Sequence, residues 1–177
     1  MLRLTGLVAV VALTGVVAAL AAEEKPLGDQ VKDAIQLFKS DSTTVAKLFD
    51  TAYGYAVLPS VGKGAVGIGG AAGDGQVFEK GALIGTCRMT QVTIGAQLGG
   101  QVYSEVIFFE TKDTLDGFKK GEWAMSAGVN AVAAAESASA DAKYKNGVQV
   151  YTIAKGGLMF EASVGGQKFK FKSLEKK

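Results

Sequence analysis

Three lysines alternate with two phenylalanines near the C-terminus, in Gln167-Lys168-Phe169-Lys170-Phe171-Lys172. Successive side chains of a strand point to opposite faces, so Lys168, Lys170 and Lys172 would share one face. A row of ammonium groups can bind phosphate headgroups or acidic polymers. Lysines on an edge strand also prevent it from pairing with other chains. The pattern therefore leaves two hypotheses open, a headgroup-binding stripe and a protected edge.

Lys63 and Lys155 are two further candidates for contact with phosphate. Glycines surround them, in Gly62-Lys63-Gly64 and in Lys155-Gly156-Gly157. Backbone N–H groups of glycine-rich turns can form concave sites for anions. We therefore expect both lysines to lie in such turns and to act there as point charges on a headgroup.

An enzymatic alternative comes from three short motifs. Ser60-Val61-Gly62-Lys63 matches the S-x-x-K motif of penicillin-recognising serine enzymes, and Tyr144-Lys145-Asn146 and Lys155-Gly156-Gly157 follow in the matching order. The serine would be the nucleophile and the lysine its activating group. That serine must open a buried helix, whereas Ser60 follows Pro59 and precedes a run of glycines. We retain this enzyme class as a remote alternative.

Other catalytic and cofactor chemistry finds little support in the residues. The chain contains no histidine, which excludes Ser-His-Asp and Cys-His catalysis and histidine-ligated zinc. Residues 62–67 fit G-x-G-x-x-G, but Ile68-Gly69-Gly70 follows and cannot sustain the helix that holds a pyrophosphate. The acidic residues show no metal-ligand spacing. We predict a protein that is not an enzyme and has no cofactor or metal.

The N-terminal segment has the layout of a secretory signal peptide. Arg3 precedes an almost wholly apolar stretch, and Ala19-Leu20-Ala21 supplies small residues for cleavage. The stretch is also nearly long enough for a retained membrane anchor. We expect residues 1–21 to be the signal peptide and residues 22–177 to be one exported domain. Its location would be periplasmic or extracellular, with or without membrane association.

Charge and cysteine content narrow the class of partner. Removal of residues 1–21 leaves 18 basic and 17 acidic residues, a net charge of +1. This balance lacks the basic footprint of a nucleic-acid-binding protein. Cys87 is the single cysteine, so no disulfide forms within the chain. We expect it to be a small buried apolar residue.

Periodicity predicts an α+β fold. Apolar residues at helical spacing predict two amphipathic helices, Gly28–Lys39 and Thr43–Thr51. A short inserted helix is predicted to begin with Thr111-Lys112-Asp113-Thr114 and to end at Gly121. Thirteen of the 24 glycines lie between Gly54 and Gly100, which disfavours helix there and suggests bulges, coiling or close backbone approach. Predicted strands are Tyr55–Leu58, Ala65–Ala71, Gln76–Glu79, Met89–Ile94, Tyr103–Glu110, Trp123–Val132, Val148–Ala154, Leu158–Val164 and Lys168–Lys172. Gly73-Asp74-Gly75 predicts a hairpin turn.

Four blocks of sequence, in order, resemble the SYLF domain family. They are Ala52-Tyr53-Gly54-Tyr55-Ala56-Val57-Leu58-Pro59, Gly73-Asp74-Gly75-Gln76-Val77, Gly95-Ala96-Gln97-Leu98-Gly99-Gly100-Gln101 and Lys155-Gly156-Gly157-Leu158-Met159-Phe160-Glu161. The resemblance implies a non-enzymatic domain that binds membranes carrying phosphoinositides or, in yeast members, actin. In that family, lipid binding is associated with an N-terminal amphipathic helix and a basic surface.

Together these observations predict an α+β domain with a strongly coiled, glycine-rich antiparallel sheet, which could close like a barrel. The predicted function is non-enzymatic binding of anionic lipid or phosphate headgroups at a membrane surface. The candidate residues are Lys168, Lys170, Lys172, Lys63 and Lys155. The alternative is a structural or protein-interaction module of the cell envelope that pairs an exposed strand with a partner.

Overall fold

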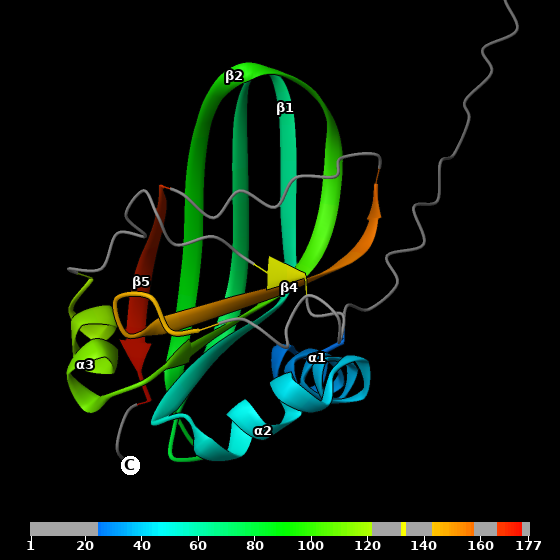
Figure 1. Ribbon diagram of the computed structural model, residues 1–177. Coiled ribbons are helices and arrows are strands. Elements are labelled where there is room, and N and C mark those ends of the chain that lie inside the picture. Colours follow the sequence, from blue (N-terminus) through cyan, green and yellow to red (C-terminus); the bar gives the residue numbers. More distant parts are fainter. Residues whose placement is uncertain (1–24, 122–131, 134–142, 158–165, 175–177) are drawn as a thin grey trace, which may run out of the picture.

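The computed structural model describes residues 25–121, 132–133, 143–157 and 166–174 (Figure 1). For residues 65–68, 93–99, 132–133 and 156–157 it describes the backbone only. The predicted signal peptide, residues 1–21, lies outside the described residues. So do the predicted strand Leu158–Val164 and nearly all of the predicted strand Trp123–Val132.

Two helices open the described chain, as the apolar periodicity predicts. Helix α1 spans Leu27–Asp41 and helix α2 spans Thr43–Thr51. The Ser42 hydroxyl accepts a hydrogen bond from the backbone N–H of Val45 at 3.2 Å, which satisfies one of the free donors at the start of α2. Ser42 is therefore the N-terminal cap of α2.

The glycine-rich region forms one very long hairpin rather than five short strands. Strand β1 spans Gly54–Glu79 and strand β2 spans Ala82–Phe109. They join at Lys80-Gly81, where φ is +49° and +79°. A two-residue loop with positive φ at both positions matches the right-handed twist of the strands. The predicted turn at residues 73–75 is wrong, because those residues continue β1.

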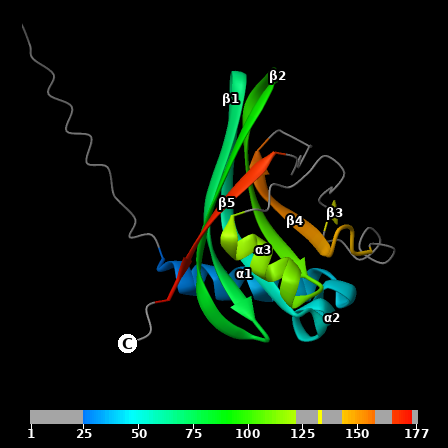
Figure 2. The ribbon, with the colours of Figure 1, turned by 90° about the vertical axis from the view of Figure 1, so that its left-hand side faces the viewer.

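The hairpin bends back on itself and supplies strands to two packed layers (Figures 1 and 2). At the bend Gly67 is opposite three residues of β2, because Val66 pairs with Leu98 and Ile68 with Ile94. The first layer contains residues 54–64 of β1, residues 100–109 of β2, and strands β4 (Val148–Gly157) and β3 (Val132–Ala133). The second layer contains residues 70–79 of β1, residues 82–91 of β2, and β5 (Gln167–Ser173).

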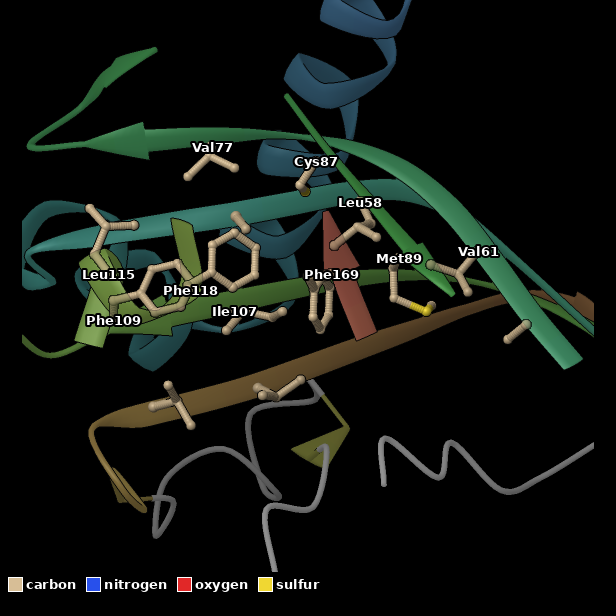
Figure 3. Packing of buried hydrophobic residues seen from close by; sticks show 14 of the residues in the cluster. Leu58, Val61, Val77, Cys87, Met89, Ile107, Phe109, Leu115, Phe118 and Phe169 are labelled. Carbon is tan, nitrogen blue, oxygen red and sulfur yellow. The ribbon is translucent and has the colours of Figure 1, made fainter. Parts of the chain in front are cut away.

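The main hydrophobic core lies between the layers. Leu58, Val61 and Ile107 from the first layer pack with Met89 and Phe169 from the second (Figure 3). All five side chains are less than 5% exposed. Burial of large apolar side chains at about 1.5–3 kcal/mol each is the main force that holds the layers together.

Two glycines of β1 allow the layers to meet closely. A Cβ atom on Gly75 would lie 2.5 Å from the backbone oxygen of Val57, and one on Gly73 would lie 2.8 Å from that of Ser60. Any side chain at these positions would push the first layer away from the second. The prediction that glycines within strands mark close backbone approach is confirmed.

Three helices pack against the two layers at one end of the molecule. Helices α1 and α2 pack on the outer face of the first layer. There the centroid of the Phe49 ring lies 5.0 Å from that of Tyr55 and 4.9 Å from that of Phe108. Helix α3, Lys112–Lys120, ends at Gly121 with φ of +71°, as predicted. Phe118 of α3 packs between Phe109 and Phe169, at 4.9 and 5.1 Å between ring centroids.

The α+β class is therefore confirmed. Strand pairing follows the open order β1-β2-β4-β3, with β5 on the other half of β2. The described strands form an open sheet, and this part of the chain gives no support for a closed barrel. Among the described residues, no helix is both long enough and apolar enough to cross a membrane.

Candidate functional site

Strand β5 presents its lysines to solvent, as its alternating sequence predicts. Lys168, Lys170 and Lys172 are exposed, whereas Phe169 is buried and Phe171 is partly buried. β5 forms one edge of the second layer (Figure 2). It pairs antiparallel with residues 85–91 of β2. The three ammonium groups therefore belong to the outer face of a sheet rather than to an isolated strand.

The strand pairing adds an arginine to these lysines. Arg88 of β2 is directly opposite Lys170, and Thr90 and Thr86 are opposite Lys168 and Lys172. Asp74 of β1 lies on the other side of Arg88 and accepts two hydrogen bonds from its guanidinium, at 2.8 and 3.0 Å. We call Asp74, Arg88, Lys168, Lys170 and Lys172 the lysine face. Its four positive charges and one negative charge give a net charge of +3.

The lysine face places like charges next to each other. Directly opposed like charges destabilise an antiparallel pair, and Arg88 and Lys170 are such a pair. Asp74 offsets the charge of Arg88 alone, from the side away from β5. Both side chains of the Arg88–Asp74 pair are more than half exposed, so water and salt weaken the pair. An anion bound on the outer face, over Arg88 and Lys170, would relieve the remaining repulsion.

Contacts on the inner side fix the position of β5. Phe169 packs against Phe118 of α3. The Gln167 side-chain amide donates a 2.9 Å hydrogen bond to a carboxylate oxygen of Glu105 in the first layer. These buried contacts hold β5 in place through its inner face. Lys168, Lys170 and Lys172 take no part in them.

Lys63 occupies a different environment from the one expected. It lies within β1, opposite Gln101, and its side chain is 3% exposed. The expected glycine-rich turn is wrong at this position, because β1 continues through Gly62 and Gly64. Lys63 is thus inside the protein and is not part of the lysine face.

Lys155 is exposed but lies in the first layer. It belongs to β4, between Ala154, which pairs with Tyr103, and Gly156, which pairs with Val102. It is therefore at a bulge of a continuous strand, and the expected turn is again wrong. The structure brings together Lys168, Lys170 and Lys172 and separates them from Lys63 and Lys155.

The enzyme-like motifs of β1 have the wrong geometry for their chemistry. Ser60 is exposed and Lys63 is buried, so the two side chains lie on opposite faces of the strand. The lysine therefore cannot activate the serine as the S-x-x-K mechanism requires. Residues 62–67 also form strand, without the helix N-terminus that a dinucleotide needs.

A carboxylate is buried between the layers. Glu105 is fully buried in the first layer, and burial raises its pKa to about 7, although the hydrogen bond from Gln167 opposes this rise. The second Glu105 oxygen has no hydrogen-bond partner among the described residues. Two groups that interact with Glu105, Tyr103 and Cys87, are uncharged at neutral pH, because burial also raises the pKa of Tyr103 and raises that of Cys87 to about 12.

Cys87 has the buried position expected of it. Its side chain is 3% exposed and packs in the core between the layers (Figure 3). The thiolate is the reactive form of cysteine, and the raised pKa keeps this thiol protonated at neutral pH. The described residues contain no group of three or more acidic or cysteine side chains that could hold a metal ion.

Sequence reasoning missed Arg88 and Glu105. The alternation Thr86-x-Arg88-x-Thr90 hints at an exposed face of β2, but the sequence does not show that β5 pairs there. Glu105 was visible as a lone acid in the apolar run 102–109. A carboxylate in such a strand predicts either an outward side chain or a buried one with a raised pKa.

Comparison with known proteins agrees with the family resemblance. Residues 90–175 match the family model described as Ysc84, the Las17-binding protein actin regulator. The chain is 35% identical over 136 residues to Beta cell expansion factor A of Aeromonas veronii, which belongs to the same family. The match covers 76% of this chain and 51% of that protein, so the chain spans about half the length of this relative. Through residues 90–175, therefore, the chain belongs to the SYLF (Ysc84) family.

Proposed function

We propose that this protein is exported and binds anionic lipid headgroups at a membrane surface through the lysine face, without catalysing a reaction. The observation that carries the proposal is the pairing of β5 with β2, which places Arg88 directly opposite Lys170 and between the rows of Lys168 and Lys172. Opposed like charges cost stability in a sheet. Features that break a local rule of folding are expected at functional sites.

The chemistry of the lysine face suits phosphate. An ammonium group is a compact point charge, and a guanidinium can donate two hydrogen bonds to one phosphate. Each basic residue near an anionic membrane contributes about 1 kcal/mol to binding. A groove on this face is lined by Arg88, Lys170, Lys172, Phe171 and Leu27, among other residues. The groove gives a headgroup an apolar side as well as a charged one.

The export part of the proposal rests on sequence alone. Residues 1–21 have the layout of a signal peptide. Family membership supports the non-enzymatic part, because the SYLF family is not known for catalysis. The geometry of Ser60 and Lys63 also speaks against the S-x-x-K alternative.

Liposome co-sedimentation tests the proposal. The purified protein should pellet with vesicles of phosphatidylcholine and phosphatidylglycerol and not with phosphatidylcholine alone. Replacement of Lys168, Lys170 and Lys172 by Gln should weaken binding about 100-fold at low ionic strength, because about 3 kcal/mol of attraction is lost. Salt at about 0.5 M should release the wild-type protein, since exposed charges are screened.

A second triple variant controls for net charge. Lys32, Lys47 and Lys143 are exposed and lie outside the lysine face. Replacing them by Gln removes the same charge from α1, α2 and the segment before β4, and binding should change less than threefold. Equal losses in both variants would show that binding follows net charge. No pelleting with any vesicle would refute the proposal.

A protein partner that pairs with β5 is the second candidate. Among the described strands, β5 pairs with β2 along one edge and with no strand along the other. A peptide could add to that edge through backbone hydrogen bonds. This mode should be insensitive to salt, whereas headgroup binding is not. Proteins captured at about 0.5 M salt, and still captured by the variant in which Lys168, Lys170 and Lys172 are replaced by Gln, would favour this candidate.

A further inference from the structure

The bent end of the long hairpin carries no charged side chain. Its two segments, residues 64–73 of β1 and residues 89–104 of β2, contain no Asp, Glu, Lys or Arg. The structure pairs these segments with each other, from Gly64 with Gly100 to Gly73 with Met89. We call residues 64–70 and 92–100 the hairpin bend. An uncharged end of this size is unusual on a protein surface, where charged residues are common.

The hairpin bend is also far from the helices. Figures 1 and 2 show β1 and β2 projecting at the end of the molecule opposite α1 and α2. At the edges of the bend, valines face outward from both layers: the side chain of Val92 is 72% exposed and that of Val102 is 40% exposed. A Cβ atom on Gly62 or Gly64 would meet nothing within 4 Å. Val92 and Val102 therefore present apolar side chains at this end of the sheet that the described part of the chain leaves uncovered.

The lysine face and the hairpin bend are continuous. Val92 follows Arg88 and Thr90 on the same outer face of β2, and Thr90 pairs with Lys168. Val92 is two residues beyond Thr90, so it lies about 7 Å further along the strand. It also lies just past the end of β5, whose first residue, Gln167, pairs with Gln91. Within two residues along β2, from Thr90 to Val92, the outer face therefore changes from a row of cations to uncharged side chains.

We infer that the hairpin bend enters the interfacial region of an anionic bilayer while the lysine face contacts the headgroups. The inference rests on the proposed function and specifies how the protein is oriented on the membrane. Charge complementarity selects the occupant: a surface with cations beside an apolar tip fits a layer of anionic headgroups above acyl chains. Because β1 and β2 remain paired through most of the bend, the backbone groups that point between the two strands enter with their hydrogen bonds made. Those on the two outer edges face water and headgroups, which the interfacial region supplies and the hydrocarbon core does not.

An environment-sensitive probe tests the depth of the bend. The variant Val92→Cys can be labelled with a nitrobenzoxadiazole dye while Cys87 stays unlabelled, because burial keeps that thiol protonated. Leu83→Cys is the matched control: Leu83 is an apolar residue of the same strand, 37% exposed, at the opposite end of the hairpin. With anionic vesicles, emission from position 92 should increase and shift to the blue, and emission from position 83 should not change.

A pair of charge variants gives a second measure. Val92→Asp should weaken partitioning into anionic vesicles about tenfold, since the apolar contact of one valine is lost. Leu83→Asp adds the same charge to the same strand and should have less than a threefold effect. Circular dichroism and thermal unfolding would verify that both variants fold.

The outcomes separate this inference from the proposed function. If the protein pellets with anionic vesicles but the probe at position 92 stays in water and Val92→Asp binds normally, the insertion is wrong and headgroup binding stands. If the protein does not pellet at all, both are wrong. A blue shift at position 92 alone, together with weaker binding of Val92→Asp, supports insertion of the bend.

Discussion

Replacement of the buried Glu105 by Gln should remove a pH dependence from the stability of this protein. Glu105 is fully buried between the two layers and accepts a hydrogen bond from Gln167. Burial raises its pKa from 4.5 to about 7. The side chain of Gln has the same shape, can accept the same hydrogen bond and never ionises. The variant therefore removes the charge with little change in packing.

The sign and size follow from the two pKa values. Between pH 4.5 and about 7 the folded protein holds a proton on Glu105 that the unfolded chain has released, so stability falls as the pH rises through this range. The contribution of Glu105 to stability is highest below pH 4.5 and is lost completely above about pH 7. A difference of about 2.5 in pKa corresponds to about 3 kcal/mol. That is a large part of the 5–15 kcal/mol that typically stabilises a folded domain.

Urea unfolding at pH 5, 6, 7 and 8 would measure this effect. The chain has no histidine, so no other side chain with an ordinary pKa titrates in this window. Asp116 is the control: Lys112 and Lys119 lower its pKa to about 2, so Asp116→Asn should leave the dependence on pH unchanged. Glu105→Gln should be nearly independent of pH and about 3 kcal/mol more stable than the wild type at pH 8.

Two results would refute this reasoning. A wild-type stability that is constant from pH 5 to pH 8 would mean that Glu105 is ionised in the folded protein throughout. A dependence on pH that survives in Glu105→Gln would assign the proton to another group.

The remaining predictions concern packing and reactivity. Gly75→Ala should destabilise the protein by about 3 kcal/mol, because its Cβ would lie 2.5 Å from the Val57 oxygen, whereas Gly62→Ala should change stability by less than about 1 kcal/mol, since nothing lies within 4 Å. Urea unfolding of both variants checks this, and equal effects would contradict it. Cys87 should not react with iodoacetamide at pH 8 until denaturant is added, because burial raises its pKa to about 12. Fast alkylation of the folded protein would show that the layers open.

Local sequence signals determined the elements that depend on neighbouring residues. The apolar spacing correctly located α1 and α2, and Gly121 correctly ended α3. The alternation of Lys168 to Lys172 correctly gave an exposed charged face and a buried aromatic one. These features follow from periodicities of 3.6 and 2 residues, which the sequence displays directly.

Only the tertiary structure decided how the glycines are used and what surrounds the lysines. Gly73 and Gly75 suggest a turn in the sequence, but they serve the close approach of one half of β1 to the other. Lys63 lies inside the protein because the first layer is covered by the second, and Arg88 joins the lysine face because β5 pairs with β2. These contacts join residues that are distant in the chain. No local pattern encodes them, since pairing partners and register are fixed by packing of the whole sheet.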